Sequence, residues 1–272
     1  MPKILFAAFV LVHSAVNGAQ PCLELNGEPA QGGMMIGRVS PGTSVTLDEQ
    51  PVMVSMQGHF VIGFGRDETG VRILSVQSSA AAPVITRELS ISQRQYNLER
   101  VDGLPPATVT PEPAALERIR QETGLIVQAR SRRDQRSDFL DPFIWPAKGR
   151  LSGFYGSQRI LNGEPRRPHY GLDIAAPEGT PVIAPAAGVV TLSHPDMYYS
   201  GGTLILDHGH GLSSTFLHLS AVDVEAGQVV KQGDQIGRIG ATGRASGPHL
   251  DWRMNWLNRR LDPQPLVADL DQ

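Results

Sequence analysis

The sequence predicts a mainly β fold in which a small N-terminal β domain and a C-terminal β domain are separated by a Pro-rich linker and a helix. Two observations lead to this fold class. The 272 residues include 29 glycines and 21 prolines. These residues interrupt helices, and their number is higher than a helical bundle tolerates. Apolar residues alternate with polar ones in short runs bounded by turn residues, which is typical of strands. The length suffices for roughly two domains, each with its own core.

Residues 1–19 have the layout of a secretory signal peptide. Lys3 precedes an apolar run from Ile4 to Val12, and the small residues Gly18 and Ala19 follow it. The run is too short to span a bilayer, so we expect export to the periplasm or the cell exterior without stable membrane insertion. The alternative is a buried N-terminal helix. The single cysteine, Cys22, leaves no intramolecular disulfide to form.

The stretch from residue 20 to 103 predicts a small antiparallel β domain. In GRVSPGTSVTLDEQPVMVSMQGHFVIGF the apolar residues alternate with polar ones, and the pattern breaks at Pro41-Gly42 and Gln57-Gly58. Residues 104–138 differ from it in composition. PPATVTPEP predicts an extended linker, and the spacing of Leu116, Ile119 and Ile126 predicts a helix after it. We interpret the arginines that follow (Arg130, Arg132, Arg133 and Arg136) as a solvated helix face, with contact to an acidic surface as the alternative.

The charge of the chain argues against some partners. Twenty-four Lys and Arg residues against 27 Asp and Glu residues give a formal charge of −3. Proteins that bind nucleic acid or anionic membranes by charge carry a basic excess. We therefore expect neither nucleic acid nor an anionic membrane surface as a partner.

The region from residue 139 to 272 predicts a second domain of short strands. GGTLILDHGHGLSSTFLHLS reads as a hairpin that turns at Asp207 to Gly211. His208 and His210 have the spacing of a ligand pair, but turn histidines usually face water, and we interpret them so. Lys231 in GQVVKQGDQIG allows another reading, that of a biotinyl or lipoyl carrier. It lacks the usual flanking residues of such a lysine.

Five polar residues of this region form the candidate site. His169 and Asp173 are four apart, so they share one face of either a strand or a helix. In PHLDWRM, alternation sends His249, Asp251 and Arg253 to one face of a strand and Leu250, Trp252 and Met254 to the other. The same alternation places His218 on one face with Phe216, and Leu217 with Leu219 on the other. Catalytic zinc takes three His or carboxylate ligands and leaves a position for water, and this set can supply them.

Three segments, HYGLDIAAPEGTPVIAPAAGVV, HGHGLSSTFLHLS and GQVVKQGDQIGRIGATGRASGPHL, closely resemble the lysostaphin-type (LytM-type) zinc metallopeptidases, which cut peptides of peptidoglycan. The resemblance covers roughly the last 120 residues. It implies an antiparallel β-sheet peptidase domain with His169 and Asp173 as zinc ligands. It also implies His218 and His249 as catalytic histidines. We expect Tyr170 or Arg253 to assist them from nearby.

The sequence departs from the family at the third ligand. Where the family has the second histidine of an H-x-H motif, this chain has Asp251. Carboxylate oxygen is a normal zinc ligand at about the same distance. Two carboxylates bring the ion and its ligands to zero formal charge, so we expect lower activity near neutral pH or a tolerance for manganese.

These residues lead to two hypotheses. The first is a secreted zinc endopeptidase that hydrolyses peptide bonds of peptidoglycan. The alternative is an inactive regulator of the same family that binds and activates a cell-wall amidase. We favour the enzyme because one motif residue of five is altered, and the replacement can still coordinate zinc.

Overall fold

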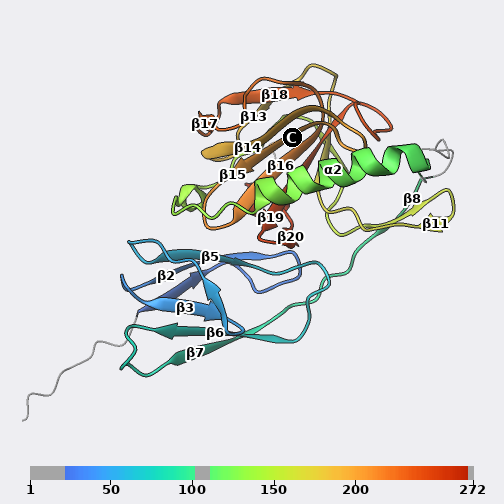
Figure 1. Ribbon diagram of the computed structural model, residues 1–272. Coiled ribbons are helices and arrows are strands. Elements are labelled where there is room, and N and C mark those ends of the chain that lie inside the picture. The colour runs from blue at the N-terminus through green and yellow to red at the C-terminus, as the bar shows by residue number, and fades with distance from the viewer. Residues whose placement is uncertain (1–21, 102–110, 269–272) are drawn as a thin grey trace, which may run out of the picture.

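The computed structural model describes residues 22–101 and 111–268. The predicted signal peptide lies outside these residues, as does most of the Pro-rich linker. Two β-rich lobes lie side by side, and the one α-helix of the described residues runs across the C-terminal lobe (Figure 1). The prediction of a mainly β, largely antiparallel fold is confirmed. No helix in the described ranges has the length and apolar character needed to cross a membrane.

The N-terminal lobe consists of two small antiparallel sheets. One has the order β1-β2-β5 and the other β4-β3-β6-β7. Their strands are β1 (Leu23–Asn26), β2 (Met34–Val39), β3 (Ser44–Leu47), β4 (Gln50–Val52), β5 (His59–Gly63), β6 (Val71–Gln77) and β7 (Ile85–Ser90). In β3 the alternating residues of the sequence bury one face, with Val45 and Leu47 in the core, whereas four consecutive residues of β5 are buried. Gly58 has φ +88°, and a Cβ there would lie 1.9 Å from the carbonyl oxygen of Val39, so the turn before β5 requires glycine.

Strand β8 (Leu98–Val101) leaves this lobe and pairs in parallel with β10 of the other one. The helix α2 (Pro113–Arg130) comes next in the described chain, with Pro113 in its first turn, where a missing N–H costs nothing. Ala129 and Ile126 pack on Leu192 and Ile205 of the large sheet. The helix therefore lies over β14 and β15, as Figure 1 shows.

The prediction of a solvated helix face is wrong for Arg130 and Arg136, whereas Arg132 and Arg133 are exposed. The helix ends at Arg130, whose Nη2 donates to Thr215 Oγ1 at 3.0 Å. Arg136 lies beyond the helix and donates from Nη2 to Asp207 Oδ2 at 2.6 Å. The sequence pattern missed these contacts because their acceptors come from the hairpin strands of the large sheet.

The C-terminal lobe is built on one large sheet with the order β17-β14-β15-β16-β19-β12-β9. Strand β18 pairs with β13 and β16, β20 pairs with β19, and a short three-stranded sheet has the order β11-β10-β8. The bounds are β9 (Arg150–Gly153), β10 (Gln158–Leu161), β11 (Glu164–Pro165), β12 (Leu172–Ala175), β13 (Pro181–Ile183), β14 (Gly188–Met197), β15 (Gly201–Asp207), β16 (Leu212–Val222), β17 (Val229–Val230), β18 (Gln235–Ile239), β19 (His249–Trp256) and β20 (Arg259–Leu261), with 3-10 turns η1 (Asp138–Leu140) and η2 (Gln264–Leu266).

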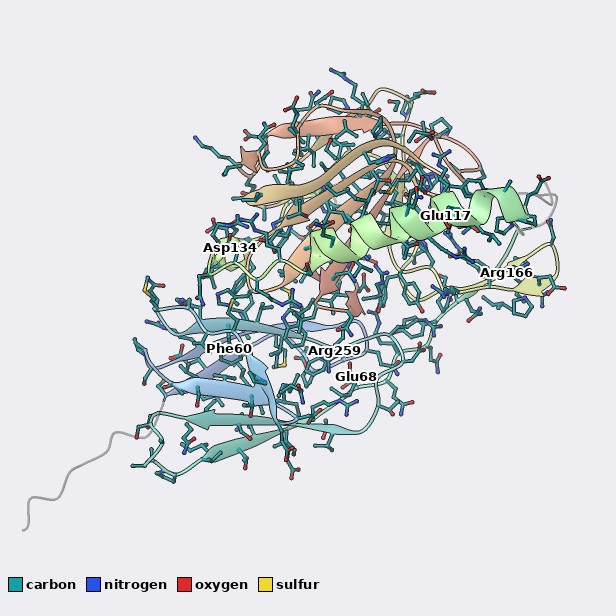
Figure 2. The ribbon with its side chains drawn as sticks, in the orientation of Figure 1. Phe60, Glu68, Glu117, Asp134, Arg166 and Arg259 are labelled. Atoms are coloured by element: carbon teal, nitrogen blue, oxygen red, sulfur yellow. The ribbon has the colours of Figure 1, made fainter. Side chains whose placement is uncertain are left out.

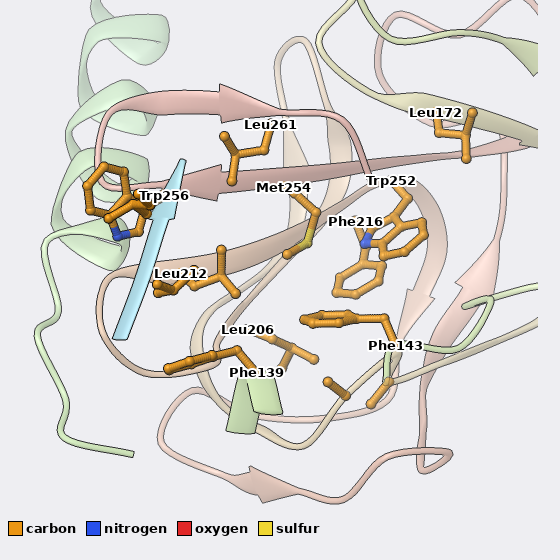
Figure 3. Packing of buried hydrophobic residues seen from close by; sticks show 14 of the residues in the cluster. Phe139, Phe143, Leu172, Leu206, Leu212, Phe216, Trp252, Met254, Trp256 and Leu261 are labelled. Carbon is orange, nitrogen blue, oxygen red and sulfur yellow. The ribbon is translucent and has the colours of Figure 1, made fainter. Parts of the chain in front are cut away.

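One face of this sheet forms the core. Phe216, Trp252 and Met254 point into it from β16 and β19, and Phe139 and Phe143 close it from the segment after the helix (Figure 3). Trp252, Phe216 and Met254 are fully buried, and burial of a large apolar side chain stabilises the fold by roughly 1.5–3 kcal/mol. The opposite face of the same strands is thereby left for polar residues.

The two lobes share this core and a set of ion pairs. A Cβ at Gly63 of β5 would lie 2.7 Å from the side chain of Leu261, so the glycine allows β20 to pack directly on the N-terminal lobe. Glu68 and Arg259 reach toward each other across the boundary in Figure 2, and Arg259 Nε lies 3.2 Å from Glu68 Oε2. Arg94 pairs with Asp262 at 2.7 Å. The lobes are therefore packed against each other over both apolar and charged contacts.

The hairpin between β15 and β16 turns where the sequence predicts, but its histidines do not face water. His208 is fully buried and His210 is 2% exposed. Phe143 packs on His208 with a ring-centroid distance of 5.3 Å, and Phe139 packs on His210 at 5.1 Å. The prediction was wrong because the chain after the helix folds back over the hairpin tip.

Candidate metal centre

Two carboxylates lie directly opposite each other on neighbouring strands. In the antiparallel pair of β12 and β19, Asp173 is the cross-strand partner of Asp251. Their flanking residues Leu172, Ile174, Leu250 and Trp252 all point into the core, so both aspartates point to the other face. Like charges in this position repel each other. A positive charge near Asp173 and Asp251 would therefore stabilise the pair.

His169 joins the two aspartates from the segment before β12. It lies outside the strand and is held by backbone hydrogen bonds, His169 N to Ser157 O at 2.9 Å and Gly156 N to His169 O at 2.7 Å. Each of His169, Asp173 and Asp251 offers a ligand atom, and these atoms all lie within 4.8 Å of one another. His169 Nε2 is 3.0 Å from Asp173 Oδ1. The structure thus brings together the three residues that the sequence predicts as metal ligands.

Two glycines leave room for the carboxylates. A Cβ at Gly171 would lie 2.1 Å from Asp251 Oδ1, and a Cβ at Gly153 would lie 2.2 Å from Asp173 Oδ2. Neither distance is possible for a real side chain. Any other residue at these positions would displace a carboxylate, so the backbone around the cluster is shaped to the two aspartates.

His249 lies on the same face as Asp251, as the alternation in β19 predicts. Its neighbours Leu250, Trp252 and Met254 are core residues. The Nε2 atom of His249 lies 3.9 Å from Asp173 Oδ1. His249 is half-buried, with 16% of its side chain exposed, so it is the part of the site that solvent reaches most easily.

His218 also reaches this face, but not with Phe216 as predicted. Leu217 is the partner of Asp251 and Phe216 the partner of Trp252. Between the pairs Leu204–Phe216 and Gly202–Leu219 the register shifts, so that two residues of β16 oppose one of β15. His218 has φ +65° there, and its ring lies 4.8 Å from that of His249. The bulge turns His218 to the polar face and returns Leu219 to the core, which strict alternation could not show.

Backbone carbonyls fix the tautomers of both histidines. Nδ1 of His218 lies 2.8 Å from Thr242 O, and Nδ1 of His249 lies 2.8 Å from Gly247 O. A carbonyl only accepts, so Nδ1 carries the proton in each neutral ring and Nε2 keeps its lone pair. Burial lowers the pKa of His218 below its ordinary value, against the opposing effect of Asp251. His218 is therefore a neutral proton acceptor at neutral pH.

Two arginines contact the carboxylates from outside the cluster. Arg253 donates from Nε to Asp251 Oδ1 at 2.9 Å and from Nη2 to Asp251 Oδ2 at 2.5 Å. Arg159 of β10 donates from Nη2 to Asp173 Oδ2 at 3.1 Å. The sequence indicated Arg253 only as a residue nearby. It gave no signal for Arg159, which comes from a separate small sheet.

The cluster fits a divalent cation. Both ring nitrogens of His169 and Oδ1 of Asp173 are buried and make no hydrogen bond of good geometry within the described parts of the chain, although His169 Nε2 and Asp173 Oδ1 are 3.0 Å apart. Buried polar atoms without partners are costly. One imidazole and two carboxylates converging on one point form a ligand set that zinc accepts. Burial would raise the pKa of Asp251, but Arg253 and His169 outweigh it and hold that pKa well below its usual range, so the carboxylate is ionised.

Comparison with known proteins places this fold and site in a family. A family profile described as "Peptidase family M23" matches residues 167–263, the segment that contains all five site residues. A crystal structure of an M23-family protein from Pseudomonas aeruginosa superposes with a TM-score of 0.64 and 31% sequence identity, over 87% of this chain and 93% of the other. The fold is thus that of a β-sheet peptidase domain. The chain belongs to peptidase family M23.

Curated relatives match over less than half of this chain. The chain is 40% identical over 111 residues to the peptidoglycan DD-endopeptidase ShyA of Vibrio cholerae, which covers 40% of this chain and 25% of the relative. It is also 40% identical over 127 residues to the DD-carboxypeptidase/endopeptidase Mpg of Neisseria gonorrhoeae, covering 47% and 27%. The matched stretch is therefore about a quarter of the length of these relatives.

Proposed function

We propose that the protein is an exported, metal-dependent endopeptidase that hydrolyses peptide bonds of peptidoglycan. The observation that carries this proposal is the convergence of His169, Asp173 and Asp251 beside two histidines with free Nε2 lone pairs. The activities named for ShyA and Mpg support peptidoglycan as the substrate class. They also favour a bond between D-configured residues as the one that is cut.

The metal ligands in this proposal are His169, Asp173 and Asp251, with zinc as the resident ion and manganese as an accepted one. A divalent cation at that position supplies a Lewis acid that polarises the scissile carbonyl and makes a water more nucleophilic. His169 binds as a neutral imidazole, and the two aspartates bind through oxygens that face the polar side of the sheet. The buried floor under the cluster keeps bulk water away and strengthens these interactions.

Two histidines handle protons in the proposed reaction. His218, neutral and held by Thr242, accepts a proton at Nε2 from the attacking water. His249 lies beside it, with a ring-centroid distance of 4.8 Å, and is the more exposed of the two. His249 accepts a hydrogen bond at Nε2 from the same water and orients it. The proton that His218 Nε2 has taken up can then form a hydrogen bond to the oxyanion on the carbonyl and pass to the leaving amine. The fixed Nδ1 contacts keep both Nε2 atoms pointed to the reacting side.

The test is the release of soluble fragments from purified sacculi. The protein is assayed as purified, after chelation, and after addition of zinc or manganese, with His249→Ala as the matched control. We expect release that chelation abolishes, that metal restores and that the variant lacks. A folded protein that carries no metal and releases nothing under any condition would contradict the proposal and favour the amidase regulator.

A further inference from the structure

Arg253 and Asp251 form a two-pronged ion pair at the candidate metal centre. Nε of the arginine contacts both carboxylate oxygens, at 2.9 Å and 3.1 Å, and Nη2 contacts Oδ2 at 2.5 Å. Asp251 is 1% exposed, and a carboxylate so deeply buried is stable only with a partner of opposite charge. The planar guanidinium fork also fixes the orientation of the carboxylate.

The pair has the charge of a neutral imidazole. Counted alone, His169, Asp173 and Asp251 carry −2, whereas a site with histidine in place of Asp251 carries −1. Arg253 adds +1 at hydrogen-bonding distance from Asp251, so Asp251 and Arg253 together sum to zero. The sequence-based expectation of a site with zero net charge left out this arginine.

The surroundings accommodate the pair as a unit. A Cβ at Gly171 would lie 2.1 Å from Asp251 Oδ1 and also 2.8 Å from Arg253 Cγ. One missing side chain therefore makes room for both partners. A carboxylate has about four lone-pair positions, so the contacts with Arg253 leave an acceptor position of Asp251 for a cation.

We propose that Asp251 and Arg253 act together as one metal-binding unit, in which Arg253 is a positioning residue that orients the carboxylate and cancels its charge. Apart from Arg159, which contacts Asp173 whichever residue stands at position 251, the cation then meets the charge of a site with a single carboxylate. This inference rests on the proposed function in that it requires a cation at the cluster. Its consequence is that positions 251 and 253 are coupled: histidine at position 251 suits the site only when the arginine is removed.

Zinc affinity measures this coupling without any assay of hydrolysis. Zinc is titrated against a chromophoric chelator in the wild-type protein, in Asp251→His and in the double variant Asp251→His/Arg253→Gln, with circular dichroism to verify the fold. In Asp251→His the guanidinium lacks its partner and repels the ion, so affinity falls at least about tenfold. The double variant restores affinity to within about threefold of the wild type, since a neutral ligand then has a neutral neighbour.

Arg260 provides the matched control. Burial and the nearby charge of Arg253 lower the pKa of Arg260. Its Nη1 donates to Asn255 Oδ1 at 3.1 Å and not to Asp251. Asp251→His/Arg260→Gln should keep the weak affinity of Asp251→His. If both double variants regained zinc affinity equally, the pairing would be overturned, because removal of any nearby positive charge would then explain the gain. Full zinc affinity in Asp251→His alone would overturn it as well.

A second measurement separates this inference from the proposed function. In the metal-free protein, Arg253→Gln leaves the Asp251 charge buried without its partner, so the midpoint of thermal unfolding falls, and Asp251→Asn/Arg253→Gln recovers most of the loss. Additive losses would overturn the pairing. A wild-type protein that binds no zinc would overturn both the unit and the proposed function, whereas zinc binding without coupling overturns the unit alone.

Discussion

The rings of His218 and His249 lie 4.8 Å apart, centroid to centroid, although the two residues come from different strands and only one of them follows the regular alternation of its strand. His249 begins β19 in ordinary alternation. His218 reaches the same place through a β-bulge with φ +65°. A non-glycine residue held in this conformation costs on the order of 1 kcal/mol, and such strain is typical of functional positions.

Replacement of either histidine by alanine should reduce hydrolysis with the metal site intact. General acid–base groups contribute about 10²–10⁴-fold to rate, so kcat in His218→Ala and His249→Ala should fall within that range. Zinc content by elemental analysis should stay at the wild-type level, because neither residue is a proposed ligand. A variant that loses zinc in proportion to activity would assign that histidine to the ligand set instead.

The hydroxyl of Thr242 should matter for His218. Thr242 Oγ1 accepts from Gly202 N at 2.9 Å and donates to Leu219 O at 2.8 Å, and this holds the carbonyl that receives His218 Nδ1. Thr242→Val removes both bonds, and we expect kcat to fall roughly tenfold with KM little changed. Thr242→Ser keeps the hydroxyl and should retain most activity. Equal loss in both variants would contradict a specific role of the hydroxyl.

Gly171→Ala should weaken metal binding. The added methyl would lie 2.1 Å from Asp251 Oδ1, so the carboxylate must move, and displaced ligands cost about 10–100-fold in affinity. Zinc affinity by chelator competition checks this. Gly124→Ala is the matched control, since a Cβ there meets no atom within 4 Å. Unchanged affinity in Gly171→Ala would show that Asp251 does not bind the ion.

His208 should make the protein less stable in acid. Burial lowers its pKa from 6.5 to about 4, with Nδ1 near Ala187 O and Nε2 near Ser214 Oγ. The unfolded chain therefore binds a proton that the folded chain rejects between pH 6.5 and 4. The stabilisation is complete above pH 6.5 and is lost as pH falls to about 4, by about 3 kcal/mol in free energy of unfolding.

Urea unfolding at a series of pH values measures this dependence. His208→Gln has no imidazole to protonate, so its free energy of unfolding should change less over the same pH range. The comparison concerns this change with pH and not the absolute stability of the variant. An identical slope in both proteins would assign the acid sensitivity to other groups. Candidates are His210 and His218, whose pKa values burial lowers.

The residues of the candidate site were predictable because local patterns and a family resemblance identify residue types and faces. Alternation in β19 put His249, Asp251 and Arg253 opposite a core of Leu250, Trp252 and Met254, and the structure has the same arrangement. The spacing of His169 and Asp173 allowed a strand or a helix. It did not show that His169 precedes the strand and is held by the loop of residues 156 and 157.

The sequence by itself determined the fold class and the hairpin, because periodicity and short motifs are local properties of the chain. Together with the family resemblance it also predicted the five residues of the candidate site. Tertiary structure alone decided four matters: the bulge at His218, the burial of His208 and His210 under Phe143 and Phe139, the contact of Arg159 with Asp173, and the charge state around Asp251. Each depends on segments distant in sequence or on which way a side chain turns. The electrostatics of a buried site is a sum over all neighbours in space, which no run of consecutive residues contains.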